Sequence, residues 1–186
     1  MKRHSSVRRL TLAASLALLA TASAHEPAKP GPATQTPAPQ AASNTVSQGM
    51  PVFVQNIAPA AADAVKVVDA FSAAIKAAKI DEAARLLDPK VLILESGSSE
   101  RSRDEYLREH AIADAAFMQT AQQQLRYRQA QVEGRIAWVG TESVLQTVKD
   151  NKPVTLLSTE SMVLKKTPQG WKIVHIHWSS RPAPGN

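Results

Sequence analysis

The sequence predicts an α+β domain in which about three N-terminal helices pack against a curved antiparallel sheet. Apolar side chains recur at helical spacing as far as about residue 118, and from residue 122 onward the pattern changes to strand-like stretches. Short turn-forming segments separate those stretches. Helices first and a curled meander afterwards is typical of helices packed on one face of an antiparallel sheet.

Two helices are expected first. Within residues 59–78, apolar side chains recur at steps of three and four residues and mark one face of an amphipathic helix: Ala64, Val68, Phe71, Ile75 and Ala78. The segment KIDEAARLLDP then predicts a shorter helix. Asp81 and Glu82 suit its first turn, and Pro89 is expected to close it.

A short strand and a third helix are expected next. The aliphatic run VLILES predicts the strand, which GSS ends. Ser102 and Glu105 have the spacing of a capping box, so a helix should begin there and run to about Met118. Its buried stripe is predicted to contain Tyr106, Leu107, His110, Asp114 and Phe117.

Four strand-like stretches make up the last third of the chain. They are QQQLRYRQAQVE, IAWVGTESVLQTV, VTLLSTESMVLKK and WKIVHIHWSS. The turn signals Gly134, KDNKP and TPQG separate them. Because these connections are short, the strands should form an antiparallel meander.

The end of the chain carries a family resemblance. The ending GWKIVHIHWSSRP, with TESMVL in the strand before it, resembles the nuclear transport factor 2-like superfamily. SnoaL-like cyclases, ketosteroid isomerase and the association domain of calcium/calmodulin-dependent kinase II share its cone-shaped fold. The resemblance covers residues 59–182 and implies a pocket at the wide end of the cone and a dimer through the open sheet face. The superfamily hosts enzymes, binders and assembly hubs, so the resemblance says more about fold than about function.

The N-terminus predicts export. Residues 1–24 combine a basic start, an apolar run of about a dozen residues and the triplet Ala22-Ser23-Ala24, which is the pattern of a signal peptide cleaved after Ala24. The apolar run is shorter than the roughly 20 residues that span a bilayer, so no stable membrane anchor is expected. The mature protein is predicted to be periplasmic or secreted. Residues 25–58 are predicted to form a Pro/Ala-rich disordered linker with a short arm or brief strand, 59–182 the domain, and 183–186 a tail.

Composition excludes several function classes. The predicted signal peptide holds four of the 22 Lys and Arg and none of the 16 Asp and Glu, which leaves 18 against 16, or a charge of +2. With three Phe, two Tyr and no basic run interleaved with aromatic residues, no nucleic-acid partner is expected. The chain has no cysteine, so disulfides, thiolate nucleophiles and thiolate metal sites are excluded.

Polar residues inside apolar elements are the candidate site. Regular alternation would place His175 and His177 on the same face of the final strand, about 6 to 7 Å apart, together with Trp171, Ile173 and Ser179. The other polar candidates are a carboxylate at the end of the first strand, a pair four residues apart on the third helix, and a carboxylate within a later strand: Glu95, His110, Asp114 and Glu160. Trp138 and Phe117 are expected to provide apolar walls.

This set favours binding of a small organic ligand without a cofactor. It is also compatible with an acid–base enzyme of the isomerase, dehydratase or cyclase type, with Glu160, Asp114 or His175 as general base. An oligomerisation hub is a third possibility, and a site for divalent copper or zinc that uses His175 and His177 is a fourth. Each residue also has a purely structural interpretation, such as a satisfied core histidine, a loop cap or a surface pair.

The opposite face of the final strand predicts self-association. Alternation would place Val174, Ile176 and Trp178 there together, with Lys172 and Ser180. An exposed apolar face usually marks an interface, so a homodimer or larger homo-oligomer is expected through the face that carries Trp178.

Overall fold

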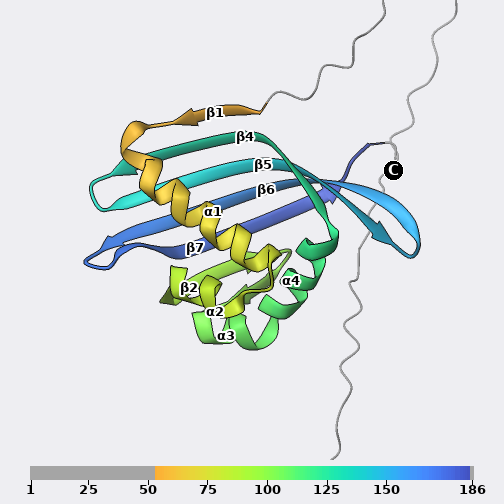
Figure 1. The fold of residues 1–186 in the computed structure, drawn as a ribbon, viewed down its shortest axis with the longest axis horizontal. Helices are drawn as coiled ribbons and strands as arrows, with labels where there is room; N and C mark the ends of the chain where they lie inside the picture. The colour runs from red at the N-terminus through yellow and green to blue at the C-terminus, as the bar shows by residue number, and fades with distance from the viewer. Residues whose placement is uncertain (1–52, 185–186) are drawn as a thin grey trace, which may run out of the picture. The chain divides into compact units, whose positions relative to one another are not determined.

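One mixed sheet of seven strands is the frame of the fold in the computed structural model of this protein (Figure 1). The structure describes residues 53–184, which lie within one compact unit. The strand order across the sheet is β1-β4-β5-β6-β7-β2-β3. The strands are β1 (Val54–Ile57), β2 (Leu87–Glu95), β3 (Ser98–Glu100), β4 (Gln122–Glu133), β5 (Ile136–Lys149), β6 (Lys152–Thr167) and β7 (Gly170–Pro182).

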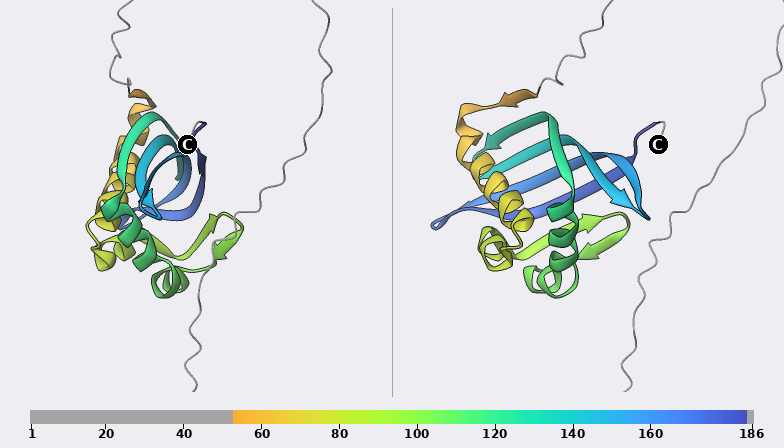
Figure 2. Two further views of the ribbon diagram at one scale, coloured as in Figure 1. Left: turned by 90° about the vertical axis from the view of Figure 1, so that its right-hand side faces the viewer. Right: turned by 45° about the vertical axis from the view of Figure 1, so that its right-hand side comes forward.

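The helices of the described region lie on one face of this sheet, and the opposite face carries none of them (Figure 2). They are the 3-10 turn η1 (Pro59–Ala61), α1 (Ala62–Lys76), α2 (Ile80–Leu86), α3 (Arg103–Glu109) and α4 (Ala111–Thr120). The α+β cone-shaped fold is therefore confirmed. None of the helices found within residues 53–184 has the length and apolar character needed to cross a membrane.

The predicted meander is confirmed, since β4, β5, β6 and β7 pair antiparallel in chain order. Asp150 and Asn151 form the two-residue turn between β5 and β6, and both have positive φ, 51° and 60°, as a tight hairpin requires. The rest of the sheet is not antiparallel as expected. β1 pairs parallel with β4, and β2 pairs parallel with β7. A parallel pair needs a long crossover, and each of these connections includes helices and other strands.

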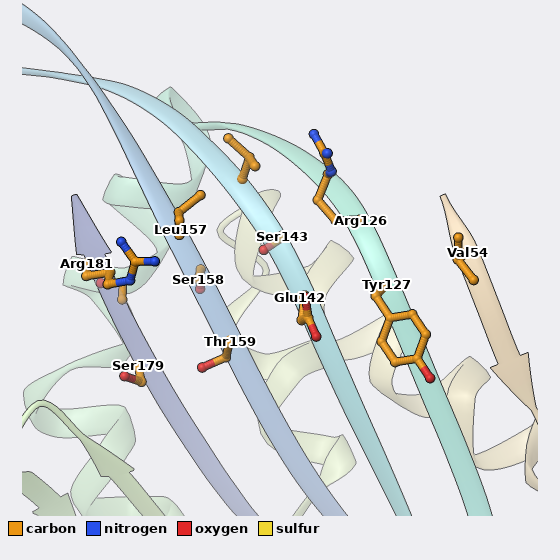
Figure 3. Close-up of a pocket in the computed structure, with 12 residues that line it drawn as sticks. Val54, Arg126, Tyr127, Glu142, Ser143, Leu157, Ser158, Thr159, Ser179 and Arg181 are labelled. Carbon is orange, nitrogen blue, oxygen red and sulfur yellow. The ribbon is translucent and has the colours of Figure 1, made fainter. Parts of the chain in front are cut away.

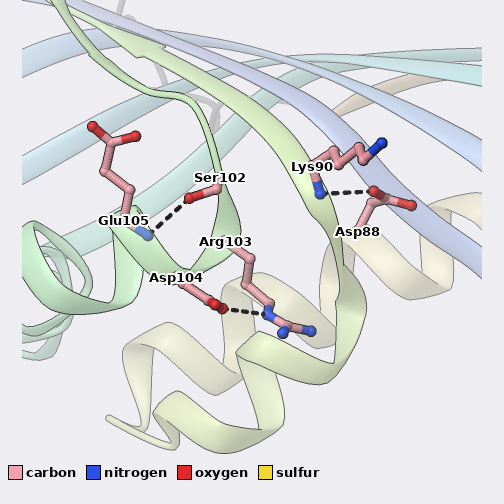
Figure 4. Close-up of polar contacts among 6 residues, drawn as sticks. All are labelled: Asp88, Lys90, Ser102, Arg103, Asp104 and Glu105. Carbon is pink, nitrogen blue, oxygen red and sulfur yellow. Dashed lines mark hydrogen bonds and ion pairs between the residues drawn. The ribbon is translucent and has the colours of Figure 1, made fainter.

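The start of α3 follows the predicted capping box (Figure 4). The Ser102 Oγ accepts a hydrogen bond of 3.1 Å from the backbone N–H of Glu105. The Glu105 carboxylate turns back and accepts from the backbone N–H of Arg101 at 2.7 Å. Two amides at this helix end are therefore satisfied by side chains, although the second is one residue earlier than the capping box predicts.

The single third helix expected as far as Met118 is in fact two helices. His110 separates α3 from α4, and its backbone, with φ −114° and ψ −30°, departs from regular helical geometry. The His110 ring pairs with Glu100, a residue buried on β3, so the break brings that ring to the edge of the sheet.

The segment around Pro89 also differs from its prediction. α2 ends at Leu86, and Pro89 lies inside β2. The pairing of β2 with β7 shifts between Leu87 and Leu92, so Pro89 sits where the ladder is irregular and its missing N–H is tolerated. The segment after Glu95 folds back as β3 and pairs with β2.

The final strand does not alternate regularly. Leu164 of β6 pairs with Ile173, and the adjacent Val163 pairs with His175, so Val174 is one extra residue on β7. This is the pattern of a β-bulge, which changes the face that later side chains occupy.

After the bulge, the side chains of β7 lie on the opposite faces from those that regular alternation predicts. Ile173 and Ile176 are both fully buried under the helices although they are three residues apart. Trp178 follows Ile176 onto the helix side and stacks on Phe71 of α1, with ring centroids 6.4 Å apart. The helix-free side of the sheet, called the open face below, therefore receives the histidines after the bulge.

Candidate functional site

A cavity of about 310 Å³ lies between α1, α4 and the helix side of the sheet. Its volume is at the lower end of the range that small-molecule sites occupy. Its apolar walls include Phe71, Ile75, Phe117, Met118, Leu145 and Leu156. Its polar groups include Glu95, Asp114, Thr141, Ser143, Ser158 and Glu160.

One row of paired residues crosses the sheet beside this cavity. Successive pairings join residues of β4, β5, β6, β7 and β2 in the order Arg128, Thr141, Glu160, Trp178 and Glu95. Residues directly opposite each other on neighbouring strands point to the same face. The row therefore places Glu160 and Glu95 on either side of Trp178.

Glu160 is a buried carboxyl group with partners on both sides. The Trp178 indole N–H donates to the Glu160 Oε2 at 2.8 Å. Burial raises the pKa of Glu160, while the hydrogen bond from Trp178, the charge of Arg128 and a hydrogen bond with Thr141 act in the opposite direction. Burial outweighs these effects, so Glu160 holds its proton more tightly than an ordinary glutamate.

Arg128 connects the row to α1. Its Nη1 donates to the Asp69 Oδ1 at 2.5 Å, and its Nε donates to the Thr141 Oγ1 at 3.3 Å. The side chain is almost fully buried, whereas Asp69 is about half exposed. Arg128 fixes α1 over the sheet and does not line the cavity.

Asp114 enters the cavity from the first turn of α4. The Tyr106 hydroxyl donates to its Oδ2 at 2.9 Å, and the Tyr106 side chain is fully buried. Burial raises the pKa of Asp114, and the hydrogen bond from Tyr106 and the charge of His110 oppose that change. Asp114 is therefore a positioned carboxyl group with an elevated pKa.

Glu95 ends β2 at the cavity. Burial, followed by the charges of Asp114 and Glu100, raises its pKa, and the charge of His110 lowers it. No group within residues 53–184 donates a hydrogen bond to its carboxylate. Glu100 lies behind this group and pairs with His110. Burial also raises the pKa of Glu100.

The structure brings four of the predicted site residues together. The same cavity is lined by Glu95, Asp114, Phe117 and Glu160. His110 is close to them in space but faces Glu100 and does not line the cavity.

The final-strand histidines and Trp138 do not line this cavity, unlike the sequence expectation. The His175 Nδ1 lies 2.9 Å from the backbone oxygen of Leu92, and His177 is exposed. Trp138 is 41% exposed on the open face. The bulge at Val174 is the physical reason that the histidines lie outside the cavity, because it places Trp178 rather than His177 beside Glu160.

Sequence reasoning missed Thr141, Ser143 and Ser158 as lining residues and assigned Trp178 to the other face. The strand IAWVGTESVLQTV did contain a signal. Ala137 and Val139 are in phase with Thr141 and Ser143, so a core-facing stripe that becomes polar could have been recognised in it.

No three His, Cys, Asp or Glu side chains in the described part of the chain converge as ligands for a metal ion. His175 and His177, the predicted metal ligands, lie on the open face without a third such residue.

A second hollow, of about 770 Å³, lies on the open face (Figure 3). Tyr127, Glu142, Thr159 and Ser179 cross it in register from β4 to β7, in front of the sheet as drawn. Arg126 and Arg181 also line it. This hollow thus presents both signs of charge.

The fold and the comparison with known proteins define the class of protein. The fold is that of the nuclear transport factor 2-like superfamily, as the sequence resemblance implied. A family model for a SnoaL-like domain matches residues 65–184, and the chain belongs to that family. None of the curated proteins matches the sequence.

Solved structures support the same assignment. A protein from Shewanella frigidimarina, provisionally described as a ketosteroid isomerase, is 31% identical with a TM-score of 0.63, covering 69% of this chain and all 100% of its own. A provisionally described dehydratase of the nuclear transport factor 2-like family from Streptomyces avermitilis is 20% identical, with a TM-score of 0.55 over 67% of this chain and 96% of its own. A calcium/calmodulin-dependent kinase II hub from S. rosetta is 24% identical, with a TM-score of 0.55 over 67% and 98%. The last two show the fold alone.

Proposed function

We propose that this protein binds a small organic molecule in the cavity between α1, α4 and the sheet. The observation that carries the proposal is the row Thr141, Glu160, Trp178 and Glu95, which brings polar groups of the sheet to a cavity that also has apolar walls. Apolar walls with a few placed polar groups are typical of small-molecule sites.

A cavity-filling variant tests this proposal. Ser72 of α1 lines the cavity and not the hollow on the open face, whereas Ser161 of β6 is exposed on the open face. In a thermal-shift screen of small molecules, compounds that stabilise the wild type should fail to stabilise Ser72→Phe but should still stabilise Ser161→Phe. Compounds that stabilise Ser72→Phe equally well, or a screen without any stabilising compound, would contradict binding in the cavity.

Acid–base catalysis of the isomerase or dehydratase type is a second candidate. It is favoured by Asp114, a cavity carboxyl group held by the Tyr106 hydroxyl, because a raised carboxyl pKa suits proton transfer nearer neutral pH. The relative at 31% identity is itself provisionally described as a ketosteroid isomerase. His175 is not retained as a candidate base, because it lies outside the cavity lining.

Deuterium exchange tests the catalytic candidate. The protein should speed the exchange of protons next to the carbonyl of a cyclic ketone in D₂O, followed by nuclear magnetic resonance. Asp114→Asn should remove this acceleration and His177→Asn on the open face should keep it. Acceleration that survives in Asp114→Asn would argue against Asp114 as the base.

We also propose export and cleavage after Ala24. The predicted signal peptide, residues 1–24, and most of the predicted linker lie outside the described residues, so the support is the sequence pattern alone. Intact mass of the protein from a cell envelope fraction should correspond to a chain beginning at His25.

A last proposal is that the open face pairs with a second copy of the chain. Leu92, Ile136 and Trp138 are 39%, 42% and 41% exposed there. Trp178, the residue first expected at this interface, packs under the helices instead. Light scattering should therefore show that Trp138→Glu is monomeric, and an unchanged molar mass would refute this interface.

A further inference from the structure

We infer that the molecule bound in this cavity carries a positively charged nitrogen, and that the cavity disfavours carboxylates, phosphates and other anions. This inference rests on the proposed binding of a small molecule in the same cavity. Three carboxyl side chains, Glu95, Asp114 and Glu160, line the cavity, whereas no Lys, Arg or His among residues 53–184 does so.

Two basic side chains beside the cavity, Arg128 and His110, are already paired with carboxylates, and a third, Arg181, lines the hollow on the open face and not the cavity. The guanidinium of Arg128 is paired with Asp69 of α1, and Arg128 stands two strands away from Glu160 in the row. The ring of His110 is paired with Glu100 on the far side of the cavity lining. Each of these two side chains already has a carboxylate partner outside the cavity.

The carboxyl groups surround one region rather than a single point. Glu160 and Glu95 flank Trp178 on neighbouring strands, so their backbones lie about 10 Å apart across the sheet. Asp114 reaches the same cavity from α4, and its charge contributes to the raised pKa of Glu95. An ammonium group bound among them would gain charge-assisted hydrogen bonds.

Glu95 is the group that such a ligand would satisfy best. Glu160 accepts from Trp178, and Asp114 accepts from Tyr106. The Glu95 carboxylate receives no hydrogen bond from the described residues and faces the like charges of Asp114 and Glu100. A cation would relieve this repulsion, whereas an anion would add to it.

The walls set the rest of the ligand's chemistry. Phe71, Phe117 and Leu156 border the cavity, so the body attached to the nitrogen should be apolar and of modest size. An aromatic or alicyclic amine is the class of ligand that fits both the walls and the carboxyl groups.

Three probes that differ only in charge test this inference: 1-naphthylmethylamine, 1-naphthylmethanol and 1-naphthoate. Isothermal titration calorimetry at neutral pH with the full chain should show the amine binding about tenfold or more tightly than the alcohol, because a hydrogen bond to a charged group adds that much. The carboxylate should give no measurable binding.

Matched variants place the preference in the cavity. Glu95→Gln should bring the affinity for the amine close to that for the alcohol. Glu142→Gln, an exposed change on the open face, should leave the preference intact and so serves as the control. Thermal unfolding of both variants checks that they are folded.

The outcomes separate the two proposals. Tighter or equal binding of the alcohol or the carboxylate would overturn the charge preference and leave small-molecule binding in place. Amine binding that is equally strong in Glu95→Gln and weaker in Glu142→Gln would place the amine on the open face and overturn the inference. No binding of any probe would overturn both proposals.

Discussion

The two faces of this sheet are built from the same strands yet differ in chemistry. On β6 and β7, Glu160 and Trp178 face the helices, whereas their neighbours Ser161 and His177 face solvent. A shift of one residue would exchange these pairs. The bulge at Val174 therefore decides whether a tryptophan or a histidine borders the cavity.

The charges of the two faces differ as well. The cavity on the helix side has carboxyl groups as its only charged lining residues within the described part of the chain, and the pKa of each is raised first by burial. The hollow on the open face mixes Arg126 and Arg181 with Glu142. Selectivity for ligand charge is therefore expected on the helix side.

Truncation of neighbouring residues in β7 should show the largest contrast. Ile176 is fully buried and His177 is exposed. Ile176→Ala should lower the free energy of unfolding by about 2 to 5 kcal/mol, because it leaves a cavity in the core. His177→Ala should change it by less than about 0.5 kcal/mol.

Urea denaturation of both variants measures this contrast. A large loss from His177→Ala with a small loss from Ile176→Ala would mean that the final strand has no bulge and that regular alternation holds.

Substitution of the two tryptophans, Trp178 and Trp138, should give a smaller difference in the free energy of unfolding. Trp178→Phe removes the N–H that donates to the Glu160 Oε2, so a buried carboxyl oxygen loses its partner. The expected cost is about 1 to 3 kcal/mol. Trp138→Phe on the open face keeps an aromatic ring at a partly exposed position and should cost less than about 0.5 kcal/mol.

Chemical denaturation monitored by circular dichroism suits this pair, since each variant loses one fluorescent indole. Equal losses from the two substitutions would show that the hydrogen bond to Glu160 contributes no stability.

Much of this fold follows from periodicity. The segment QQQLRYRQAQVE is β4 from its first to its last residue, and the faces of α1 and β5 follow directly from their apolar spacing. α1 and β5 keep one period throughout, so local pattern and tertiary packing agree there. β4 has the expected bounds, but its pairing with β5 shifts between Leu125 and Tyr127, so its two ends are not in one phase.

The errors occur where a period is interrupted. The bulge at Val174 leaves no mark in the sequence, because IVHIH is compatible with either phase of a strand. The break at His110 coincides with the contact of its ring with Glu100, a residue that lies outside the helix pattern. The sequence did identify three cavity residues, Glu95, Asp114 and Glu160. A carboxyl group inside an apolar element is costly whichever face it lies on, so this signal does not depend on the strand or helix phase.

The pH dependence of stability should give the smallest contrast. Burial raises the folded-state pKa of Glu160 above its ordinary value of 4.5, although Trp178, Thr141 and Arg128 oppose this change and the charge of Asp69 adds to it. The folded state then binds the proton more tightly than the unfolded state. This contribution to stability is complete below the unfolded-state pKa and is lost as pH rises through the folded-state pKa.

The free energy of unfolding of the wild type, relative to Glu160→Gln, should therefore fall as the pH rises above 4.5, by at most about 1.4 kcal/mol for each pH unit. Glu142→Gln on the open face is the matched control, because it makes the same carboxyl-to-amide change at an exposed position. Denaturation curves at several pH values supply both differences. A rise with pH of the difference for Glu160→Gln would mean that the hydrogen bonds of Glu160 outweigh burial and that its folded-state pKa is lowered.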